Sequence, residues 1–572
     1  MTAFRAALSA LAFASAALTG ALSHAPVAHA CGCFAPPDPS VPVVQAGERI
    51  LFAMENGVVT AHIQIQYAGN AQEFGWILPL PSIPTLELGT DELFTSLGNT
   101  TQPKYRLQRL FEGNCNQRGG VSATPPSAGQ PSDSESDGGA GGRSPLVFQD
   151  SIGPYDYAVL RADSKTDLLR WLSDNRYFVP AGTDTVVNAY IRPNAYFLAL
   201  KLRSGKSAGD LQPVVLKYPS DLPMIPIVLT SVAAQPNMGI QVFMLGRARA
   251  IPRNYYHTVI NDALIDWQTG GQNYNDVIIR AVRTAPERHS FVTEYAGVSS
   301  VMRNQLDRTG RFGTQAALAA RANAGDFIQY MQNVGYAFTS QVVSILTRYI
   351  PLPAGLARAG VSAAQWIQSF AFYSSADYQR RNPSQFQDWP GVDYKPAEMA
   401  QELEERIARP TRATSALFER YPYLTRLYTT LSPEDMTRDP VFSFNPTLLA
   451  YSNVHEATLT TYCDGSNQPL TSMPARLVTE QGYILQYPNG TGSRTTPTPF
   501  AASDSTPPST RLEILREEGP PEVVVDNKAL IQGGFSPRSC SSGGDNPAAL
   551  PMLMLLLIAA GLVAWRRYDR RG

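Results

Sequence analysis

Charged residues are scarce in this sequence of 572 residues. Asp, Glu, Lys and Arg make up 17% of it, and the two signs nearly cancel to a formal net charge of −1. A protein that binds nucleic acid through its phosphates needs a field of basic residues, and this balance does not supply one. The composition therefore argues against a nucleic-acid partner.

Motifs of the common catalytic sites are also missing. The sequence has no His-Glu-x-x-His zinc motif, no Gly-x-Ser-x-Gly nucleophile motif and no Walker-type phosphate loop. A Rossmann unit would need a glycine-rich turn between a strand and a helix, and none is present. We therefore expect no cofactor and no metal.

The N-terminal apolar run predicts export. Arg5 precedes a stretch rich in Ala and Leu that ends Val27-Ala28-His29-Ala30, which is typical of a signal peptide over residues 1–30. Cleavage would fall before Cys31. A cysteine at that position also fits a lipoprotein, but Ala28 and His29 favour ordinary cleavage.

The C-terminal apolar run predicts an anchor. It spans eighteen residues, Ala548 to Trp565, which is near the lower limit for a transmembrane helix. Four arginines follow within 566–571, and basic residues stay on the cytoplasmic side. A buried core helix is the alternative, but it would need no arginine-rich end. We expect the chain outside the cytoplasm, in the cell envelope or on the surface, held in the membrane at its C-terminus with the short tail cytoplasmic before any processing.

The tail also carries a resemblance. Cys540-Ser-Ser, a low-complexity lead-in, one apolar helix and an arginine cluster resemble the C-terminal sorting signals of the MYXO-CTERM type. The resemblance implies a transient sorting handle within residues 540–572, processing near Cys540, and export and sorting machinery as partners. A plain single-pass anchor remains the alternative.

The chain contains only five cysteines. With Cys540 assigned to the tail, Cys31, Cys33, Cys115 and Cys463 remain, an even number that predicts two disulfides in an oxidising compartment. Cys31 and Cys33 flank one glycine and are too close to pair comfortably. We expect each to reach one of Cys115 and Cys463, in either order. A Cys-x-Cys metal site is the alternative, and it lacks a nearby histidine or second cysteine pair.

The first exported region, residues 31–118, predicts an antiparallel β region. Apolar runs at Ile50–Met54 and Val58–Tyr67 are separated by Asn56-Gly57, the strongest short hairpin pattern. Alternation from Phe74 to Leu80 then predicts a half-buried strand with Trp76 in the core.

These stretches resemble a family. The opening Cys31-Gly-Cys-Phe34, the hairpin and Gln66–Pro81 are similar to the bacterial domain-of-unknown-function family 2330. Later stretches match as well: Tyr155–Val159, Phe291–Gly297 and Leu424–Phe442. The resemblance covers most of the exported chain outside residues 301–415. It implies an exported protein with no assigned activity, and it brings no catalytic residues.

The middle of the chain predicts a loop and a mixed region. Residues 119–147 are rich in Gly, Ser, Pro and Asp and have few large apolar side chains, a composition typical of disorder. Residues 148–300 predict an α+β region with one helix begun by Ser164. The strands expected there are Tyr157–Leu160, Ala195–Leu202, Val214–Tyr218, Ile227–Val232 and Ile240–Leu245.

A helical insertion is expected over residues 301–415, where Ser362 begins a helix and Met399, Leu403 and Ile407 recur every four residues. Residues 416–490 predict a β-rich closing region, and 491–539 a Thr/Pro-rich stalk with a possible hairpin. The fold class is thus α+β: a mainly antiparallel body of two sheet regions, a helical insertion and a C-terminal transmembrane helix.

Two functions remain open. The first is a non-catalytic binding or structural module of the envelope, whose ligand the sequence does not identify. The second is a membrane-anchored extracytoplasmic hydrolase built from dispersed residues. A deep pocket that holds two or more of the following residues within hydrogen-bond reach would favour the hydrolase: His257, His289, His455, Glu294 and Glu456. For Glu294 the default is a hydrogen-bonded carboxylate, since a carboxylate needs a partner before it has a mechanism.

Overall fold

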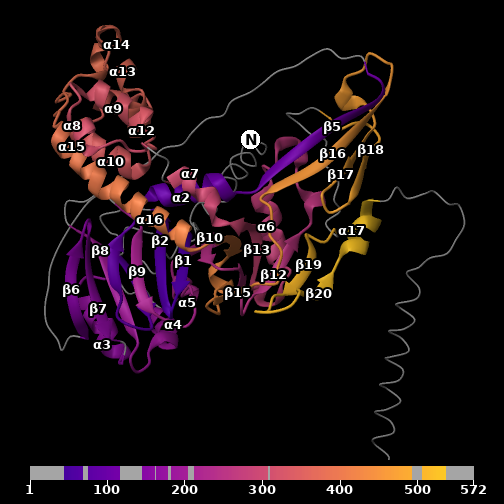
Figure 1. The fold of residues 1–572 in the computed structure, drawn as a ribbon, viewed down its shortest axis with the longest axis horizontal. Coiled ribbons are helices and arrows are strands. Elements are labelled where there is room, and N and C mark those ends of the chain that lie inside the picture. The colour runs from indigo at the N-terminus through magenta and orange to yellow at the C-terminus, as the bar shows by residue number, and fades with distance from the viewer. Residues whose placement is uncertain are drawn as a thin grey trace, which may run out of the picture. The chain divides into compact units, whose positions relative to one another are not determined.

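The computed structural model describes residues 44–68, 75–115, 145–161, 163–177, 182–203, 211–306, 310–492 and 506–535. The expected signal peptide and the tail from Cys540 lie outside these ranges. The described residues form an α+β fold with mixed and antiparallel sheets, in agreement with the expected class (Figure 1). None of the helices within them is both long enough and apolar enough to cross a membrane.

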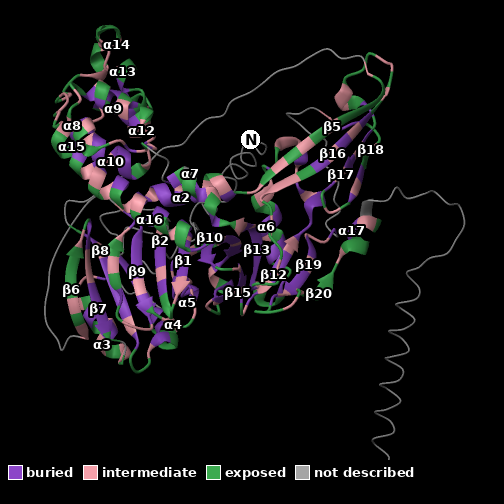
Figure 2. Cartoon of the chain, in the orientation of Figure 1, coloured by how far each residue is buried: buried purple, intermediate pink, exposed green. Residues whose placement is uncertain are grey.

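The largest element is a sheet of ten strands. Its spatial order is β20 (Glu522–Asp526), β19 (Ser509–Ile514), β12 (Tyr256–Ile260), β13 (Ser290–Val298), β14 (Tyr423–Leu431), β10 (Ala234–Gly246), β1 (Val44–Glu55), β2 (Val58–Ala68), β9 (Val214–Pro219) and β4 (Thr85–Leu88). Most neighbours are antiparallel, but β1 with β10 and β12 with β13 are parallel. Figure 2 shows that the central strands of this main sheet are largely buried.

The hairpin expected at Asn56-Gly57 is confirmed. β1 and β2 pair antiparallel with Glu55 opposite Val58, which leaves a two-residue turn. Both turn residues have positive φ, 52° at Asn56 and 73° at Gly57. A type I′ turn needs that conformation at both positions, and Asn-Gly meets the need at low cost.

A second sheet covers one face of the main sheet. Its order is β3 (Gly75–Leu80), β8 (Tyr196–Leu202), β7 (Tyr155–Arg161) and β6 (Leu146–Ile152). Ile50 and Phe52 of β1 share one hydrophobic core with Trp76 of β3 and Leu198 of β8. Trp76 is in the core, as expected. The prediction that this strand is half-buried is wrong, because all six residues of β3 are buried.

The opposite face of the main sheet is covered by helices α2 (Asp91–Thr101), α7 (Arg303–Leu306) and α16 (Arg409–Arg420). Thr90 caps α2, since its hydroxyl accepts a hydrogen bond from the Glu92 amide. Leu51 and Phe243 of the sheet pack against Phe94 of α2. This second core occupies only part of the face, and the rest of it is polar.

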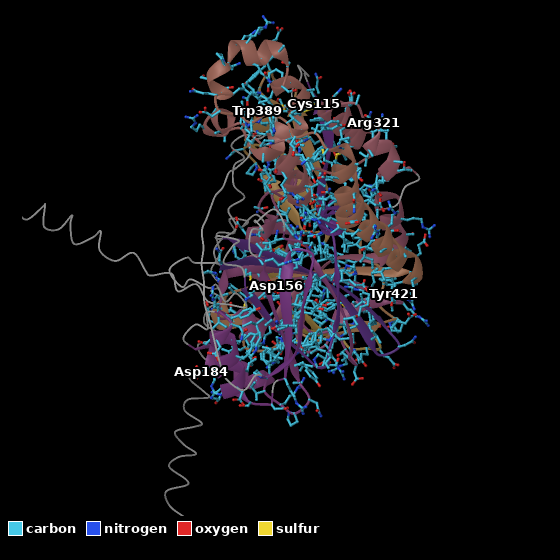
Figure 3. The ribbon with its side chains drawn as sticks, turned by 90° about the vertical axis from the view of Figure 1, so that its left-hand side faces the viewer. Cys115, Asp156, Asp184, Arg321, Trp389 and Tyr421 are labelled. Atoms are coloured by element: carbon cyan, nitrogen blue, oxygen red, sulfur yellow. A yellow bond between two sulfur atoms is a disulfide. The ribbon has the colours of Figure 1, made fainter. Side chains whose placement is uncertain are left out.

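The described residues between β13 and β14 contain a series of helices joined by loops, from α7 to α16. The remaining helices of this segment are α8 (Gln315–Ala319), α9 (Ala324–Asn333), α10 (Ser340–Tyr349), α11 (Ala354–Arg358), α12 (Ala363–Gln368), α13 (Phe370–Tyr373), α14 (Ala376–Arg381) and α15 (Pro396–Leu403). Ser362 begins α12 with a capping box, and Met399, Leu403 and Ile407 are buried in the segment's own core. Figure 3 marks Arg321 and Trp389 among these helices.

A proline shapes the junction of α15 and α16. Pro410 has no amide hydrogen, so the carbonyl of Arg406 loses its normal helical partner. Residues 404–408 form a short π-helix at this junction. The side-chain amides of Gln341 and Gln212 donate to that carbonyl instead, at 3.0 and 3.4 Å. The junction is therefore tied both to α10 and to the body of the protein.

A third sheet contains β18 (Ile484–Tyr487), β17 (Ala475–Val478), β16 (Val454–Asp464) and β5 (Lys104–Asn114). β5 and β16 are parallel over eleven residue pairs. A short ladder joins β11 (Arg249–Pro252) to β15 (Phe442–Asn445). The hairpin expected near the end of the chain forms as β19 and β20, and it extends the main sheet through β12.

One expected strand is wrong. Ile227–Val232 contains the short helix α5 (Ile227–Thr230), because Pro226 starts a turn in which the Thr230 and Ser231 amides bond back to the carbonyls of residues 226 and 227. The other helices are α3 (Lys165–Asp174), α4 (Thr183–Val187), α6 (Tyr274–Val282) and α17 (Lys528–Phe535). Ser164 caps α3 as expected.

Candidate functional site

A polar pocket of about 480 Å³ lies on the face of the main sheet that α2 covers only in part. Side chains alternate along a strand, so Arg49 of β1 points to the same side as Leu51, which packs under α2. The same relation joins Gln241 to Phe243 on β10. One face of the sheet is thus apolar beneath α2 and polar beside it.

The lining of this pocket combines amides, tyrosines and two ion-pairing side chains. It contains Gly47, Glu48, Arg49, Gln66, Gln102, Pro103, Tyr105, Asn237, Gly239, Gln241, Gly270, Gly271, Tyr274, Asn275, Glu294, Arg426 and Tyr428. None of these described lining residues is Ser, Thr, Cys, Lys or His. The volume falls within the range of about 300–1,000 Å³ that is typical of small-molecule sites.

Glu294 and Arg426 form a buried ion pair at the floor of the pocket. The guanidinium Nε of Arg426 donates to Glu294 Oε2 at 2.5 Å, and Tyr274 donates to Oε1 at 2.7 Å. A β-bulge explains the position, because Glu294 is an extra residue between Thr293 and Tyr295 in the pairing of β13 with β14. Arg426 also donates to Thr101 of α2, so the pair has partners on every side.

Three tyrosines present neutral hydroxyl groups. Burial raises the pKa of Tyr428 to about 12, and burial also raises the pKa of Tyr105 and of Tyr274 well above the ordinary value. All three remain protonated at neutral pH. The Tyr428 hydroxyl donates to Asn275, and the ring of Tyr274 lies 5.6 Å from that of Tyr105.

Two glycines leave the space that the side chains of Tyr428 and Tyr105 occupy. A Cβ atom at Gly239 would lie 2.8 Å from the Tyr428 hydroxyl, and one at Gly271 would lie 2.4 Å from the Tyr105 ring. Gly271 also has a φ of 82°, which a residue with a side chain rarely adopts. Glycine at both positions therefore shapes the pocket.

The carboxylate of Asp91 is linked to the pocket residue Arg49 through Gln64. Gln64 donates to Asp91 Oδ1 at 2.6 Å and accepts from Arg49 at 3.4 Å. Burial raises the pKa of Asp91 to about 6, although the Gln64 amide opposes the rise. The Asp91 amide donates to Gln341 of α10, so the helical segment contacts this wall.

The sheet interior contains a chain of contacts shaped like a catalytic triad. Thr293 Oγ1 lies 3.0 Å from His257 Nε2, and His257 Nδ1 lies 3.0 Å from Glu513 Oε2. Arg249 donates to the same threonine oxygen at 3.0 Å. His257, Thr293 and Glu513 are at most 5% exposed and line neither of the two pockets described here. Because the network is buried, we assign it to the stability of β12, β13 and β19.

The five residues proposed for a hydrolase do not converge. His289 contacts the carbonyl of Asp435, and His455 contacts Glu480, while Glu456 contacts Gln108 and Arg106 on the surface. None of His257, His289, His455, Glu294 and Glu456 is hydrogen-bonded to another of the five, and only Glu294 lines the polar pocket. Glu294 is a hydrogen-bonded, ion-paired carboxylate.

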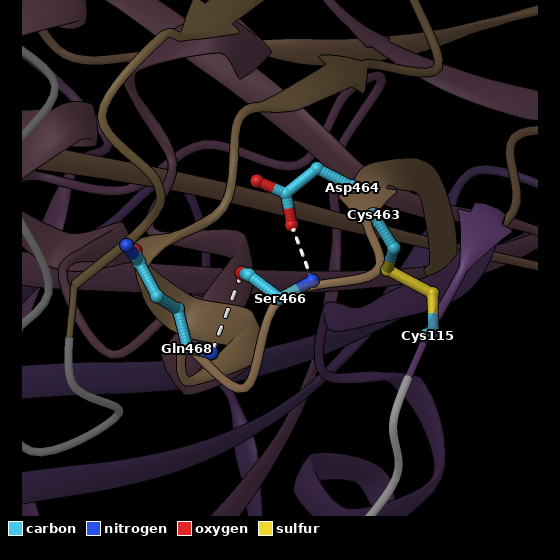
Figure 4. The surroundings of a disulfide bond; sticks show 5 residues. All are labelled: Cys115, Cys463, Asp464, Ser466 and Gln468. Carbon is cyan, nitrogen blue, oxygen red and sulfur yellow. Dashed lines mark hydrogen bonds between the residues drawn. A yellow bond between two sulfur atoms is a disulfide. The ribbon is translucent and has the colours of Figure 1, made fainter.

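The cysteine pairing differs from expectation. Cys115 and Cys463 are bonded to each other, with Cα atoms 5.1 Å apart (Figure 4). The expected bridges from Cys31 and Cys33 to these two cysteines are therefore wrong. The parallel ladder of β5 and β16 is the cause, because it places Gly113 opposite Cys463 and brings Cys115 alongside. Cys31, Cys33 and Cys540 lie outside the described residues.

The second pocket and the acidic, histidine and cysteine side chains offer no further candidate site among the described residues. A pocket of about 110 Å³ between the two sheets is mainly apolar and is lined by core residues such as Ile50 and Phe52. Within the described ranges no three His, Cys, Asp or Glu side chains are grouped so that they could hold a metal ion.

Residues 25–350 match a family model described as an uncharacterized protein conserved in bacteria (DUF2330). The match runs into 301–350, which we expected to lie outside the family resemblance, and it ends before Leu424–Phe442, which we expected inside it. No curated protein and no solved structure matches the chain.

Proposed function

The chain belongs to the bacterial family DUF2330 of uncharacterized proteins, and from that premise we propose that it is an exported, C-terminally anchored envelope protein that binds a polar ligand without transforming it. The observation that carries this proposal is the polar pocket, with its tyrosine hydroxyls, its side-chain amides and its fully partnered Glu294–Arg426 pair.

The lining favours recognition by hydrogen bonds. Gln66, Gln102 and Gln241 offer amide groups that both donate and accept, and Tyr428 offers a neutral hydroxyl. A tyrosine also presents an apolar ring beside its polar tip. A ligand rich in hydroxyl groups, with C–H faces between them, fits this combination.

The same lining disfavours catalysis. A hydrolase needs a nucleophile or an activated water and a base with a free lone pair. Glu294 directs both oxygens at partners, one at Arg426 and one at Tyr274. Within the described ranges, the triad-shaped network at His257 supports the alternative of an anchored hydrolase, but it is buried.

Export and anchoring are supported by features of the sequence and by one bond. Residues 1–30 have the pattern of a signal peptide, and 540–572 have that of a sorting signal or anchor. A disulfide joins Cys115 to Cys463, and disulfides persist in oxidising compartments. The membrane and the sorting machinery are the partners that follow from this placement.

Binding is tested with the detergent-solubilised full chain and a panel of oligosaccharides, by calorimetry, with mass spectrometry of the recovered ligand. Gln241→Ala and Tyr428→Phe each remove a hydrogen-bonding group worth about 0.5–1.5 kcal/mol, so affinity should fall about 2- to 10-fold. Tyr462→Phe, on β16 outside the pocket, is the matched control and should leave affinity unchanged. Ligand recovered in cleaved form would favour the hydrolase, and Thr293→Val would then have to abolish cleavage.

Placement is tested by fractionation. The full chain should be in the membrane or on the surface, and deletion of residues 541–572 should release it to the periplasm or the medium. Recovery of the intact chain in the cytoplasm would contradict the placement.

A further inference from the structure

One cation in the polar pocket, Arg49, forms no ion pair with a described carboxylate. Arg49 makes a single hydrogen bond to a described side chain, to the Gln64 amide at 3.4 Å, and forms no ion pair within the described residues. A guanidinium group carries five N–H donors in a fork that matches a carboxylate. Most of that capacity faces the pocket unused.

The carboxylates near Arg49 have other hydrogen-bond or ion-pair partners. Glu294 is paired with Arg426, and Asp91 accepts from the Gln64 amide that stands between it and Arg49. Glu48 lines both this pocket and the smaller apolar pocket, and along β1 it follows the opposite alternation to Arg49. Arg49 therefore lines the pocket without a carboxylate of the described residues at ion-pair distance.

The surroundings of Arg49 disfavour its positive charge. Burial lowers the pKa of its guanidinium, and the nearby charge of Arg426 lowers it further. A half-buried cation next to a second cation is costly unless an anion offsets it. The Asp91 carboxylate raises this pKa in part, but no carboxylate of the described residues forms an ion pair with Arg49, so its fork of N–H donors is open to an anion from outside.

We propose that the pocket binds an acidic saccharide, with a sugar carboxylate paired to Arg49 and the ring hydroxyls on the glutamine amides and Tyr428. This inference rests on the proposed binding function and names its ligand class. A carboxylate is favoured over a phosphate, because a single guanidinium without an ion pair matches a monoanionic group and Arg426 is already paired with Glu294.

The saccharide class follows from the lining. Gln66, Gln102 and Gln241 come from three different elements and surround the space above Arg49. Hydroxyl groups can donate to and accept from each of these amides, whereas a purely apolar ligand would leave them unpaired. A uronate provides both the hydroxyls and the carboxylate in one molecule.

The test compares trigalacturonate with its carboxyl-reduced form, trigalactose, on the full chain in detergent at neutral pH. Charge-assisted hydrogen bonds are worth about 1.5–3 kcal/mol, so the acid should bind at least 10-fold tighter. Arg49→Gln should abolish that preference, so that its affinities for the acid and for trigalactose become equal within about 2-fold. Arg49→Lys should retain part of the preference, since it keeps the charge but loses the fork. Arg516→Gln, an exposed arginine on another part of the chain, is the control and should change neither affinity.

The outcomes separate the two proposals. Equal binding of the acid and neutral forms, or a preference that survives Arg49→Gln, overturns the acidic-saccharide inference while the binding function stands. Absence of binding to either saccharide overturns both. Tighter binding of a galactose phosphate overturns the carboxylate, and tighter binding of an acidic tripeptide overturns the saccharide class.

Discussion

Removing the Cys115–Cys463 bond should cost the protein a large part of its stability. The two cysteines are 348 residues apart in the chain, so the bond closes a very long loop in the unfolded state. The chain-entropy model gives about 6 kcal/mol for a loop of that length at 25 °C. Residual structure in the unfolded chain lowers the effect, and native disulfides typically contribute about 2–5 kcal/mol.

The experiment compares the wild type with the Cys115→Ala/Cys463→Ala double variant. Urea unfolding, followed by fluorescence under oxidising conditions, should give a free energy of unfolding about 2–5 kcal/mol lower for the double variant. Reduced wild-type protein should resemble the variant, which provides an internal control. The loss should be global, because the bond ties β5, early in the chain, to β16, late in the chain.

Two results would refute this reasoning. A loss below about 0.5 kcal/mol would mean that the ladder of β5 and β16 already fixes the two segments without the bond. Non-reducing peptide mapping that joined Cys31 or Cys33 to Cys115 would show that the pairing itself is different.

Three further predictions concern buried polar groups, and each is measured by chemical unfolding. Glu294→Ala should lower the free energy of unfolding by about 3–5 kcal/mol, because it leaves the Arg426 charge buried without its partner. Glu294→Gln also removes the charge and should lose a similar free energy, so wild-type stability in Glu294→Gln would contradict a charge effect. Asp439→Asn should flatten the pH dependence of stability, because burial raises the folded pKa of Asp439 from 3.8 to about 6. The contribution of this group to stability is fully present below pH 3.8 and falls by about 3 kcal/mol as the pH rises through 6. An unchanged slope of stability from about pH 4 to 7 in the variant would contradict this. Gln341→Ala should cost about 1–3 kcal/mol, because the Arg406 carbonyl loses an amide donor, and no loss would show that the remaining donor suffices.

Features set by neighbouring residues could be predicted from the sequence. The hairpin follows from the positive φ that Asn56 and Gly57 accept, and the helix starts at Ser164 and Ser362 follow from side-chain capping. The buried row Met399, Leu403 and Ile407 follows from helical periodicity. Each of these depends on contacts within a few residues.

Features set by distant pairing could not be predicted. β3 reads as an alternating strand, but it joins β8 in a second sheet and is buried on both sides. The disulfide depends on the parallel pairing of β5 with β16, which no local pattern records.

The candidate site belongs to this second group. Its floor depends on a one-residue bulge that turns Glu294 toward Arg426, and these residues are 132 positions apart. The sequence singled out Glu294 but gave it no partner, and Arg49 carried no motif at all.

The most direct test of the central claim is a crystal structure of the full chain with trigalacturonate bound. The account predicts an intact ligand in the polar pocket, with one carboxylate on the Arg49 guanidinium and ring hydroxyls within hydrogen-bond distance of Gln241 and Tyr428. Ligand bound at any other place, ligand cleaved in the crystal, or an empty pocket at saturating ligand would contradict it.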